Sequence, residues 1–158
     1  KVHQPLKYYA TYFSIRVTDF DIETMMKGYD AIKSKILDIQ AKGFEATNKE
    51  NGVLESLKIA LEASARGIHF GKISLEKSDA THFRIDEEHE NTLIPSFSTI
   101  DGLGGTVAQK IIEEREQQAF LSIEDFQKRG KVSQTLVDKM RLMGILDDLP
   151  ESSQLTLF

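Results

Sequence analysis

The spacing of apolar residues changes at Gly67, and this change limits the folds that the chain can adopt. Before it, apolar side chains recur every three or four residues through Ile22–Ile39 and Leu54–Ala65, which is the period of amphipathic helices. After it, apolar and polar residues alternate at Ile73–Leu75 and Phe83–Ile85, which is the period of half-buried strands. The sequence therefore predicts a mainly α chain with a small β element, an α+β fold.

Glycines and capping residues divide the first part of the chain into helices. The aromatic and β-branched stretch Pro5–Ile15 is expected to be buried, and its pattern fits either a helix or a strand. One helix is predicted from Asp21 until Gly43, where a left-handed stop is expected. Thr47 and Glu50 have the spacing of a capping box, so a second helix is expected to begin there and to pack on the first as a hairpin.

The composition excludes several classes of protein. The 158 residues include no cysteine, which excludes disulfides, thiolate zinc sites and a cysteine nucleophile. No run of about 18 apolar residues occurs, and no secretion leader is recognised, so we expect no membrane span and a cytoplasmic location. The net charge of −5 argues against a broad basic surface, so any contact with nucleic acid must be local. The chain begins at Lys1 in the middle of a pattern, and we expect a fragment of a longer protein.

A leucine between two glycines, followed by an amphipathic helix, carries the clearest chemical signal. Gly102 and Gly104 permit a tight turn whose backbone can approach a phosphate, and the amides as far as Thr106 would face that anion at a helix N-terminus. The stretch Ile100–Ile112 resembles the helix-hairpin-helix element of DNA-binding proteins, which grips the sugar-phosphate backbone and reads no base. The predicted phosphate contacts here are Gly102, Leu103, Gly104, Gly105, Thr106 and Lys110.

Two residues depart from this resemblance. Many helix-hairpin-helix proteins carry lysine or arginine where Thr106 stands, and Asp101 places a negative charge on the approach to the turn. Both differences weaken the expected grip on a phosphate. Leu103 is expected to plug back between the helices, and Ala108 to keep the second helix close. The alternative is a plain glycine loop that joins two helices.

Capping residues predict a second helical pair after the hairpin. Ser122 and Asp125 can cap a short helix that Gly130 ends, and Ser133 can begin a longer helix that Gly144 follows. Three cations cluster at the break and could contact phosphates of the other DNA strand: Lys128, Arg129 and Lys131. The alternative is a solvated helix end, where cations interact favourably with the helix dipole.

The last five residues, Gln154–Phe158, place large apolar side chains beyond a polar segment, Leu149–Ser153, that is interrupted by proline. This segment is predicted to be a tether. An extended peptide offers its main chain to a partner and drops alternate side chains into pockets. The alternatives are a frayed terminus and a tail folded onto its own core. The predicted partner contacts are Gln154, Leu155, Leu157 and Phe158.

Five stretches, in their order and spacing, resemble the C-terminal end of the alpha subunit of bacterial replicative DNA polymerase III, of the PolC type found in Gram-positive bacteria. They are Gln4–Phe13, Ile100–Gly104, Phe120–Phe126, Gly144–Leu149 and Gln154–Phe158. The family usually has histidine at the position of Gln4 and serine at that of Thr156, which are conservative differences.

The resemblance implies three segments with different roles. Residues 1–67 would be the C-terminal part of the helical fingers. Residues 68–149 would be a small β element with a tandem helix-hairpin-helix module that holds the primer-template duplex. Residues 150–158 would be a flexible tail that docks in the sliding clamp, the beta subunit, with Gln154 hydrogen-bonding and with Leu157 and Phe158 filling the pocket. The implied partners are the clamp, duplex DNA and the rest of the polymerase chain, and no membrane.

Catalysis is not expected of this chain alone, and no catalytic residue is predicted. In the resembled family the metal-binding aspartates belong to the palm, where the parent polymerase is expected to need Mg²⁺. No metal or other cofactor is expected in this fragment. The acidic loop Asp86–Asn91 contains His89, but adjacent loop positions do not converge on one ion without help from elsewhere.

Two other classes of protein would also contain such a hairpin. A base-excision glycosylase would place a catalytic lysine or aspartate soon after it, facing a base pocket, whereas Glu116–Phe120 occupy that region here. An independent DNA-binding scaffold would explain the hairpin and would make the terminal peptide a coincidence.

Overall fold

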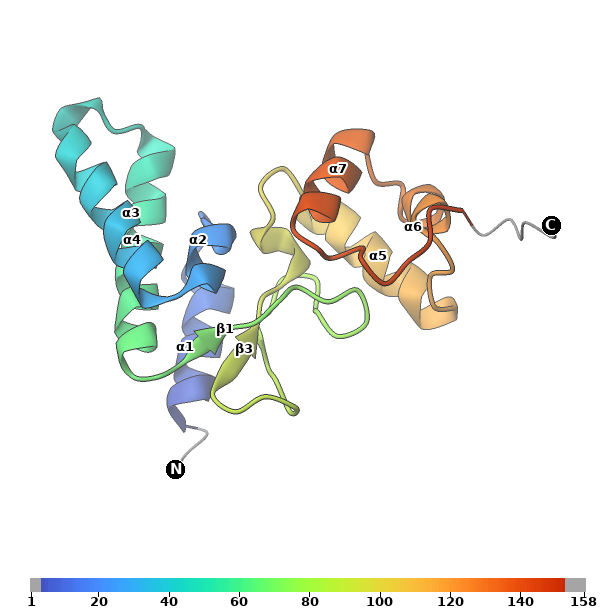
Figure 1. Cartoon of the computed structure of the whole chain (residues 1–158), viewed down its shortest axis with the longest axis horizontal. Coiled ribbons are helices and arrows are strands. Elements are labelled where there is room, and N and C mark those ends of the chain that lie inside the picture. Colours follow the sequence, from blue (N-terminus) through green and yellow to red (C-terminus); the bar gives the residue numbers. More distant parts are fainter. Residues whose placement is uncertain (1–3, 153–158) are drawn as a thin grey trace.

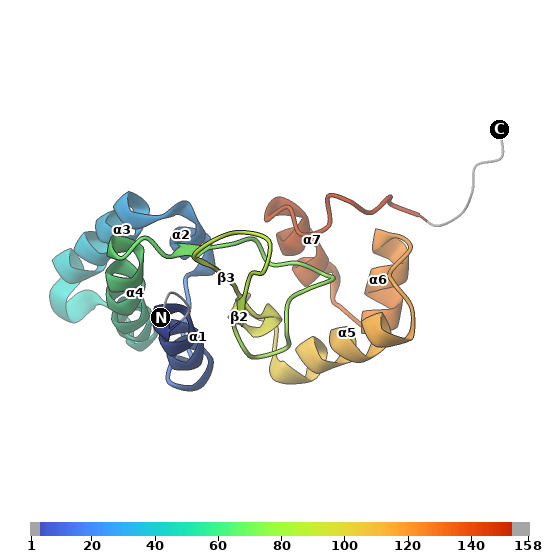
Figure 2. The same cartoon turned by 90° about the horizontal axis from the view of Figure 1, so that it is seen from below.

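The computed structural model of the chain describes residues 4–152, and Figure 1 shows that they form three regions in a row. The first contains α1 (Gln4–Ile15), α2 (Ile22–Lys27), α3 (Tyr29–Lys42), the 3₁₀ turn η1 (Gly43–Glu45) and α4 (Asn48–Ala65). The second is a small sheet of β1 (His69–Phe70), β2 (Arg84–Ile85) and β3 (Thr92–Ile94). The third contains the 3₁₀ turn η2 (Phe97–Thr99), α5 (Gly105–Gln117), α6 (Ile123–Gly130) and α7 (Gln134–Leu142). The view in Figure 2 has the same order. The predicted α+β class is confirmed.

The first region is helical throughout, so Pro5–Ile15 belongs to a helix. The single helix predicted from Asp21 is wrong in one respect, because the chain breaks at Gly28, whose φ of 100° no helix can contain. The capping box predicted at the start of α4 is confirmed. Thr47 Oγ1 accepts the Glu50 amide at 3.0 Å, and Glu50 Oε1 accepts the Thr47 amide at 3.0 Å. As predicted, α3 and α4 pack as a hairpin (Figure 1).

The sheet has the order β1-β3-β2, with β1 parallel and β2 antiparallel to β3. The predicted strand at Phe83–Ile85 is confirmed in part as β2. The strand predicted at Ile73–Leu75 is wrong, because this segment bends instead. Ser78 Oγ accepts the Ser74 amide at 2.8 Å, and Ser74 Oγ accepts the amides of Glu76 and Lys77, at 3.2 and 3.1 Å. Two serine hydroxyls thus accept backbone N–H groups that a strand would have donated to a neighbouring strand.

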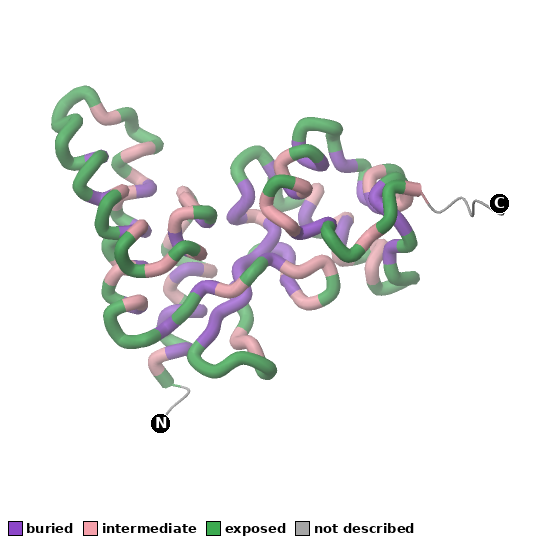
Figure 3. Tube along the Cα trace, viewed as in Figure 1, coloured by how far each residue is buried: buried purple, intermediate pink, exposed green. Residues whose placement is uncertain are grey.

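One core of buried side chains runs through all three regions (Figure 3). At its centre Phe13 of α1 stacks on Phe83, with ring centroids 5.4 Å apart, and meets the edge of Phe70 at the same distance. The Phe83 amide also donates to Ser14 Oγ at 2.8 Å. The change of pattern at Gly67 therefore marks a change of secondary structure within one continuous core.

The segment predicted to be a tether is held against the body as far as Glu151. Pro150 O accepts the Ile123 amide at 2.8 Å, and Glu151 O accepts the Glu124 amide at 3.1 Å. The side chain of Glu151 also pairs with Arg141. The predicted partner peptide Gln154–Phe158 lies outside the described residues. Among residues 4–152, no helix combines the length and apolar character needed to cross a membrane.

Candidate nucleic-acid interface

The hairpin turn lies between η2 and α5, and its apolar residues fix it to the core. Ile100 and Leu103 are almost fully buried, and the Leu103 amide donates to Ile100 O at 3.0 Å. Gly102 has a φ of 87°, a conformation that favours glycine, so it sets the shape of the turn. Ala108 is fully buried in the second helix of the hairpin. The burial of Leu103 and Ala108 agrees with the packing that the sequence motif predicted for them.

Gly104 keeps the approach to α5 open. Its φ of −77° would suit any residue, but no atom lies within 4 Å of the position that a Cβ would take. No side chain caps this helix, and its first turn has no acidic residue. The amides of Gly105, Thr106 and Val107 have no acceptor among the described residues, and the first bonded amide is that of Ala108, 3.0 Å from Gly104 O. Free amides at the positive end of a helix dipole form a site for an anion.

The other helices after η1 begin differently. Thr47 caps α4, Ser122 caps α6 and Ser133 caps α7, each through a side-chain oxygen that accepts a backbone amide. These starts are those that the sequence predicted. α5, like α3 and η2, begins without a side-chain cap, and it does so at the place where the sequence motif predicts a phosphate.

Two of the predicted cations are brought to this open helix end. Lys110 and Lys131 line one hollow of about 620 Å³ together with Gly105, Thr106 and one acidic residue, Glu113. Lys131 has a left-handed backbone with a φ of 53° and ends α6. Lys110 also pairs with Glu114, at 3.2 Å between Nζ and Oε2. Lys128 is exposed and does not line this hollow.

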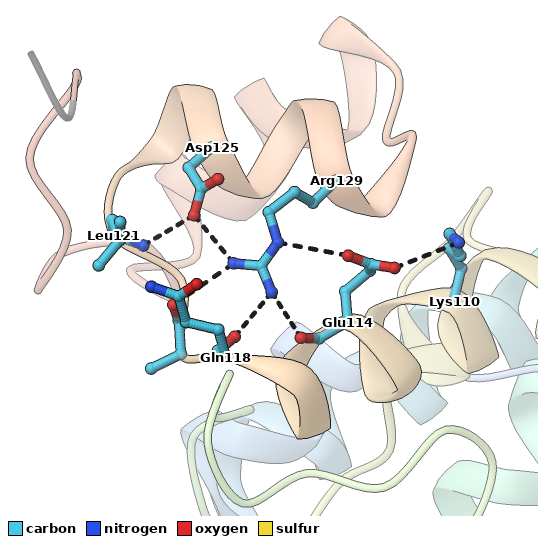
Figure 4. A network of polar contacts seen from close by, with 7 residues as sticks. Lys110, Glu114, Gln118, Leu121, Asp125 and Arg129 are labelled. Atoms are coloured by element: carbon cyan, nitrogen blue, oxygen red, sulfur yellow. Dashed lines mark hydrogen bonds and ion pairs between the residues drawn. The ribbon is translucent and has the colours of Figure 1, made fainter.

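Arg129 was predicted to contact phosphate, but its guanidinium is used within the fold (Figure 4). It donates to Glu114 Oε1 at 3.3 Å, to Asp125 Oδ2 at 3.0 Å and to the carbonyl oxygens of Glu114 and Gln118 at 2.5 and 2.7 Å. It also lies 4.7 Å from the ring centroid of Phe120. Arg129 thereby joins the C-terminal end of α5 to α6, and we leave it out of the interface.

Two lysines that no sequence pattern indicated lie beside Asp101 and offset its negative charge. Lys49 Nζ lies 2.6 Å from Asp101 Oδ1, and Lys139 Nζ donates to Asp101 O at 3.0 Å. The hydrogen bond from Lys49 lowers the pKa of Asp101 below its ordinary value. These lysines come from α4 and α7, so no local sequence pattern could have placed them at the turn.

The acidic loop after β2 is held together by its own residues. Asp86 Oδ1 accepts the Glu88 amide at 2.8 Å, and Asp86 Oδ2 lies 2.9 Å from His89 Nδ1. Across residues 4–152, no three histidine, aspartate or glutamate side chains group as metal ligands.

Comparison with known proteins bears on the same region. The family described as "Helix-hairpin-helix motif" matches residues 67–155. The whole chain is 49% identical to a protein of Bacillus subtilis (strain 168) named DNA polymerase III PolC-type, and 48% identical to the protein of that name in Lactococcus lactis subsp. lactis (strain IL1403). The chain spans only 11% and 10% of the length of these two relatives. By these matches the chain belongs to the helix-hairpin-helix family and fits as a segment of a PolC-type DNA polymerase III.

Proposed function

We propose that this chain holds the DNA duplex through the backbone amides of its hairpin and tethers a replicative DNA polymerase to its sliding clamp. The observation that carries the DNA contact is the open start of α5. The amides of Gly105, Thr106 and Val107 have no acceptor among the described residues, and the glycine turn leaves space for an oxyanion beside them. Such donors suit a phosphate that comes from outside the molecule.

The anion is best matched by the backbone of a nucleic acid. The relatives are named as DNA polymerases, and the matching family is a helix-hairpin-helix. Main-chain amides recognise phosphate oxygens and carry no information about bases, so we expect binding that is indifferent to sequence. Lys110 and Lys131 add local positive charge to a chain whose net charge is −5. The affinity should therefore be weak and should fall with added salt.

Two substitutions at Gly104 test the phosphate contact. Gly104→Val fills the open approach with a side chain, and we expect the affinity for a short duplex to fall by about tenfold, which is ~1.4 kcal/mol. Gly104→Asp places a negative charge at the same point but supplies a favourable helix cap, so it should bind DNA still less while keeping or raising the melting temperature.

Fluorescence anisotropy with labelled duplex measures the affinity, and thermal unfolding checks each fold. Lys58→Ala is the control, since Lys58 is exposed on α4 and pairs only with Glu55. Duplex binding by both Gly104 variants at the level of this control would remove the hairpin from the DNA contact.

The clamp contact rests on the pattern of Gln154, Leu155, Leu157 and Phe158. In the proposed contact Gln154 hydrogen-bonds at one end of a pocket on the clamp, and the apolar side chains fill it. This contact and the duplex contact would act as one strong attachment, because tethering raises effective concentration. The chain would position the polymerase on its DNA. The residues that catalyse the reaction would lie elsewhere in the polymerase.

Titration of purified sliding clamp tests this second contact. We expect the chain to bind, and the double variant Leu157→Ala with Phe158→Ala and the chain without residues 154–158 not to bind. The melting temperature should stay nearly unchanged in both variants, because a terminal peptide that serves a partner is expected to contribute little to the stability of its own chain. Equal clamp affinity of all three proteins would refute the contact.

A further inference from the structure

We propose that one exposed face of α1 is the surface through which this chain packs against the rest of the polymerase. The residues of this α1 face are Tyr8, Thr11, Tyr12 and Ile15. Figure 2 shows α1 at an edge of the molecule, on the side away from α6 and α7. The proposal uses the fit of the chain as a segment of a longer polymerase, and it does not depend on the DNA contact or on the clamp contact.

The helix α1 is apolar on two sides. Its inner side is buried in the core through Leu6, Tyr9, Ala10 and Phe13. The α1 face lies on the outer side, and its residues recur at the helical spacing of three or four positions. Tyr8 and Ile15 are 59% and 65% exposed, and the rings of Tyr8 and Tyr12 lie with centroids 6.3 Å apart. A helix that is apolar all round is typical of one that has protein on both sides.

The other long helices of the first region present charged side chains to solvent. Exposed charged residues on α3 include Asp30, Lys33 and Asp38, and those on α4 include Glu55 and Lys58. In contrast, Lys7 is the only charged residue between Gln4 and Ile15. Single exposed apolar residues are normal on a protein surface, whereas a continuous apolar face marks a contact. The α1 face is therefore distinct from the outer sides of α3 and α4.

The size of the α1 face indicates a partner in the same polypeptide. The 12 residues of α1 span about 18 Å, and a stripe about 10 Å wide along them covers roughly 200 Å². A stable contact between separate proteins needs roughly 800 Å² on each partner. A covalent connection raises the effective concentration of the partner, so a smaller contact suffices within one chain. Most of the length of the relatives lies outside this chain and can supply that partner.

Charges beside the α1 face define the chemistry of the partner surface. Lys7 and Arg16 are exposed directly before and after it, and within residues 4–152 neither side chain forms an ion pair. No acidic residue occurs between Gln4 and Arg16. Tyrosine suits an interface, because its ring is apolar and its hydroxyl group donates and accepts hydrogen bonds. The partner surface is therefore apolar, with carboxylates at its edge.

Hydroxyl-radical footprinting of the full-length polymerase, without DNA or clamp, tests the proposal. The oxidation rate of each side chain is divided by its rate in the same protein unfolded by urea. Buried residues of the same type are the references, because Tyr9 is 1% exposed and Ile32 is 0% exposed. We expect Tyr8 to lose its reactivity and to oxidise as slowly as Tyr9, and Ile15 as slowly as Ile32.

Three outcomes would overturn the proposal. Oxidation of Tyr8 and Ile15 much faster than that of their references would show that the α1 face meets solvent in the polymerase. Protection that appears only after duplex is added would assign the face to DNA, and protection that is lost on dilution would assign it to a second copy of the polymerase. The Gly104 variants and the deletion of residues 154–158 report the DNA and clamp contacts separately, so the proposed function and the α1 contact can fail independently.

Substitution of Ile15 in the full-length polymerase provides a second test. Ile15→Lys places a charge in the α1 face and should restore oxidation of Tyr8, whereas Ile15→Leu should leave Tyr8 protected. Tyr9 should stay protected in both variants, which shows that α1 is still folded. Leu37→Lys is the matched control at an exposed position of α3 and should leave Tyr8 protected. Equal protection of Tyr8 in Ile15→Lys and Ile15→Leu would contradict a contact across this face.

Discussion

Arg129 joins α5 to α6, the two helices that follow the hairpin turn. Its guanidinium N–H groups donate to neighbours within the fold. Its guanidinium contacts the side chains of Glu114 and Asp125 and the carbonyl oxygens of Glu114 and Gln118 at the C-terminal end of α5. A cation at a helix C-terminus also interacts favourably with the helix dipole. Arg129 therefore contributes to stability, and Lys110 and Lys131 remain the predicted cations near the open helix end.

Arg129→Ala should lower the free energy of unfolding by about 2 kcal/mol, because it removes the hydrogen bonds that join the C-terminal end of α5 to α6. Duplex affinity should change little at a temperature where the variant is folded. Lys128→Ala is the control from the same helix end, and as an exposed site it should stay within about 0.5 kcal/mol of the original chain. Urea denaturation measures both. If the two variants are equally stable, the network in Figure 4 does not hold α5 to α6.

Acid should weaken the same network. Hydrogen bonds from Lys110 and then Arg129 lower the pKa of Glu114 from its ordinary value of 4.5. A carboxyl group whose pKa is lowered by folding stabilises the fold above its unfolded pKa, and this contribution is lost as pH falls through the folded value. We therefore expect stability to decline below about pH 4.5 and to decline less in Glu114→Gln. Unfolding followed by circular dichroism across this range checks it.

Residues that act on their immediate neighbours could be predicted from the sequence. Thr47, Ser122 and Ser133 cap the helices that their spacing predicted. Lys49 and Lys139 could not be predicted, because they reach Asp101 only after the chain has folded, from 52 and 38 positions away.

At the scale of elements, the bend between β1 and β2 shows that periodicity predicts which side chains are buried but does not predict whether a segment pairs as a strand. Alternation at Ile73–Leu75 places apolar side chains on one side, and Ile73 is indeed buried. A strand also requires a partner for its backbone, and here Ser74 and Ser78 supply the acceptors instead. Arg115 of α5 then donates to the carbonyl oxygens of Leu75 and Ser78, so the bend is tied to the hairpin helix.

Ser78→Ala should loosen this bend. Ser78 is fully buried, and its hydroxyl accepts the Ser74 amide at 2.8 Å, so the variant should be less stable by about 1–2 kcal/mol. Hydrogen exchange at the Ser74 amide should also become faster. Ser34→Ala, at an exposed position of α3, is the control and should be neutral or slightly stabilising because alanine favours helices. Slow exchange at Ser74 in the Ser78 variant would show that another group holds the bend.

For the whole molecule, the shared aromatic core decides how the chain unfolds. Sequence periodicity predicted the secondary-structure classes well, and it suggested a segment boundary at Gly67. It carried no information on Phe13 meeting Phe70 and Phe83, since contacts between distant residues depend on the folded topology. The helices of the first region and the strands that support the hairpin consequently depend on the same packing.

We expect a single cooperative unfolding transition for the chain. All four tyrosines lie within the first 29 residues, so tyrosine fluorescence reports the first region while far-UV circular dichroism reports every helix. The two transitions should coincide. Phe83→Ala should lower stability by about 3–4 kcal/mol and shift both together. Phe44→Ala, at a fully exposed phenylalanine, should shift neither. Separate transitions for the two probes would show two independently folding parts.

The contact between Lys49 and Asp101 has a consequence for how this sequence can change over time. An aspartate beside the proposed phosphate site would repel the anion unless cations offset its charge, and the nearer of its two lysines belongs to a helix encoded 52 positions earlier. Loss of Lys49 alone would leave only Lys139 to offset Asp101 at the proposed phosphate site, and loss of Asp101 alone would leave Lys49 without its counterion. Relatives that lose the lysine are therefore expected to lose the aspartate as well, and the two positions should covary across an alignment.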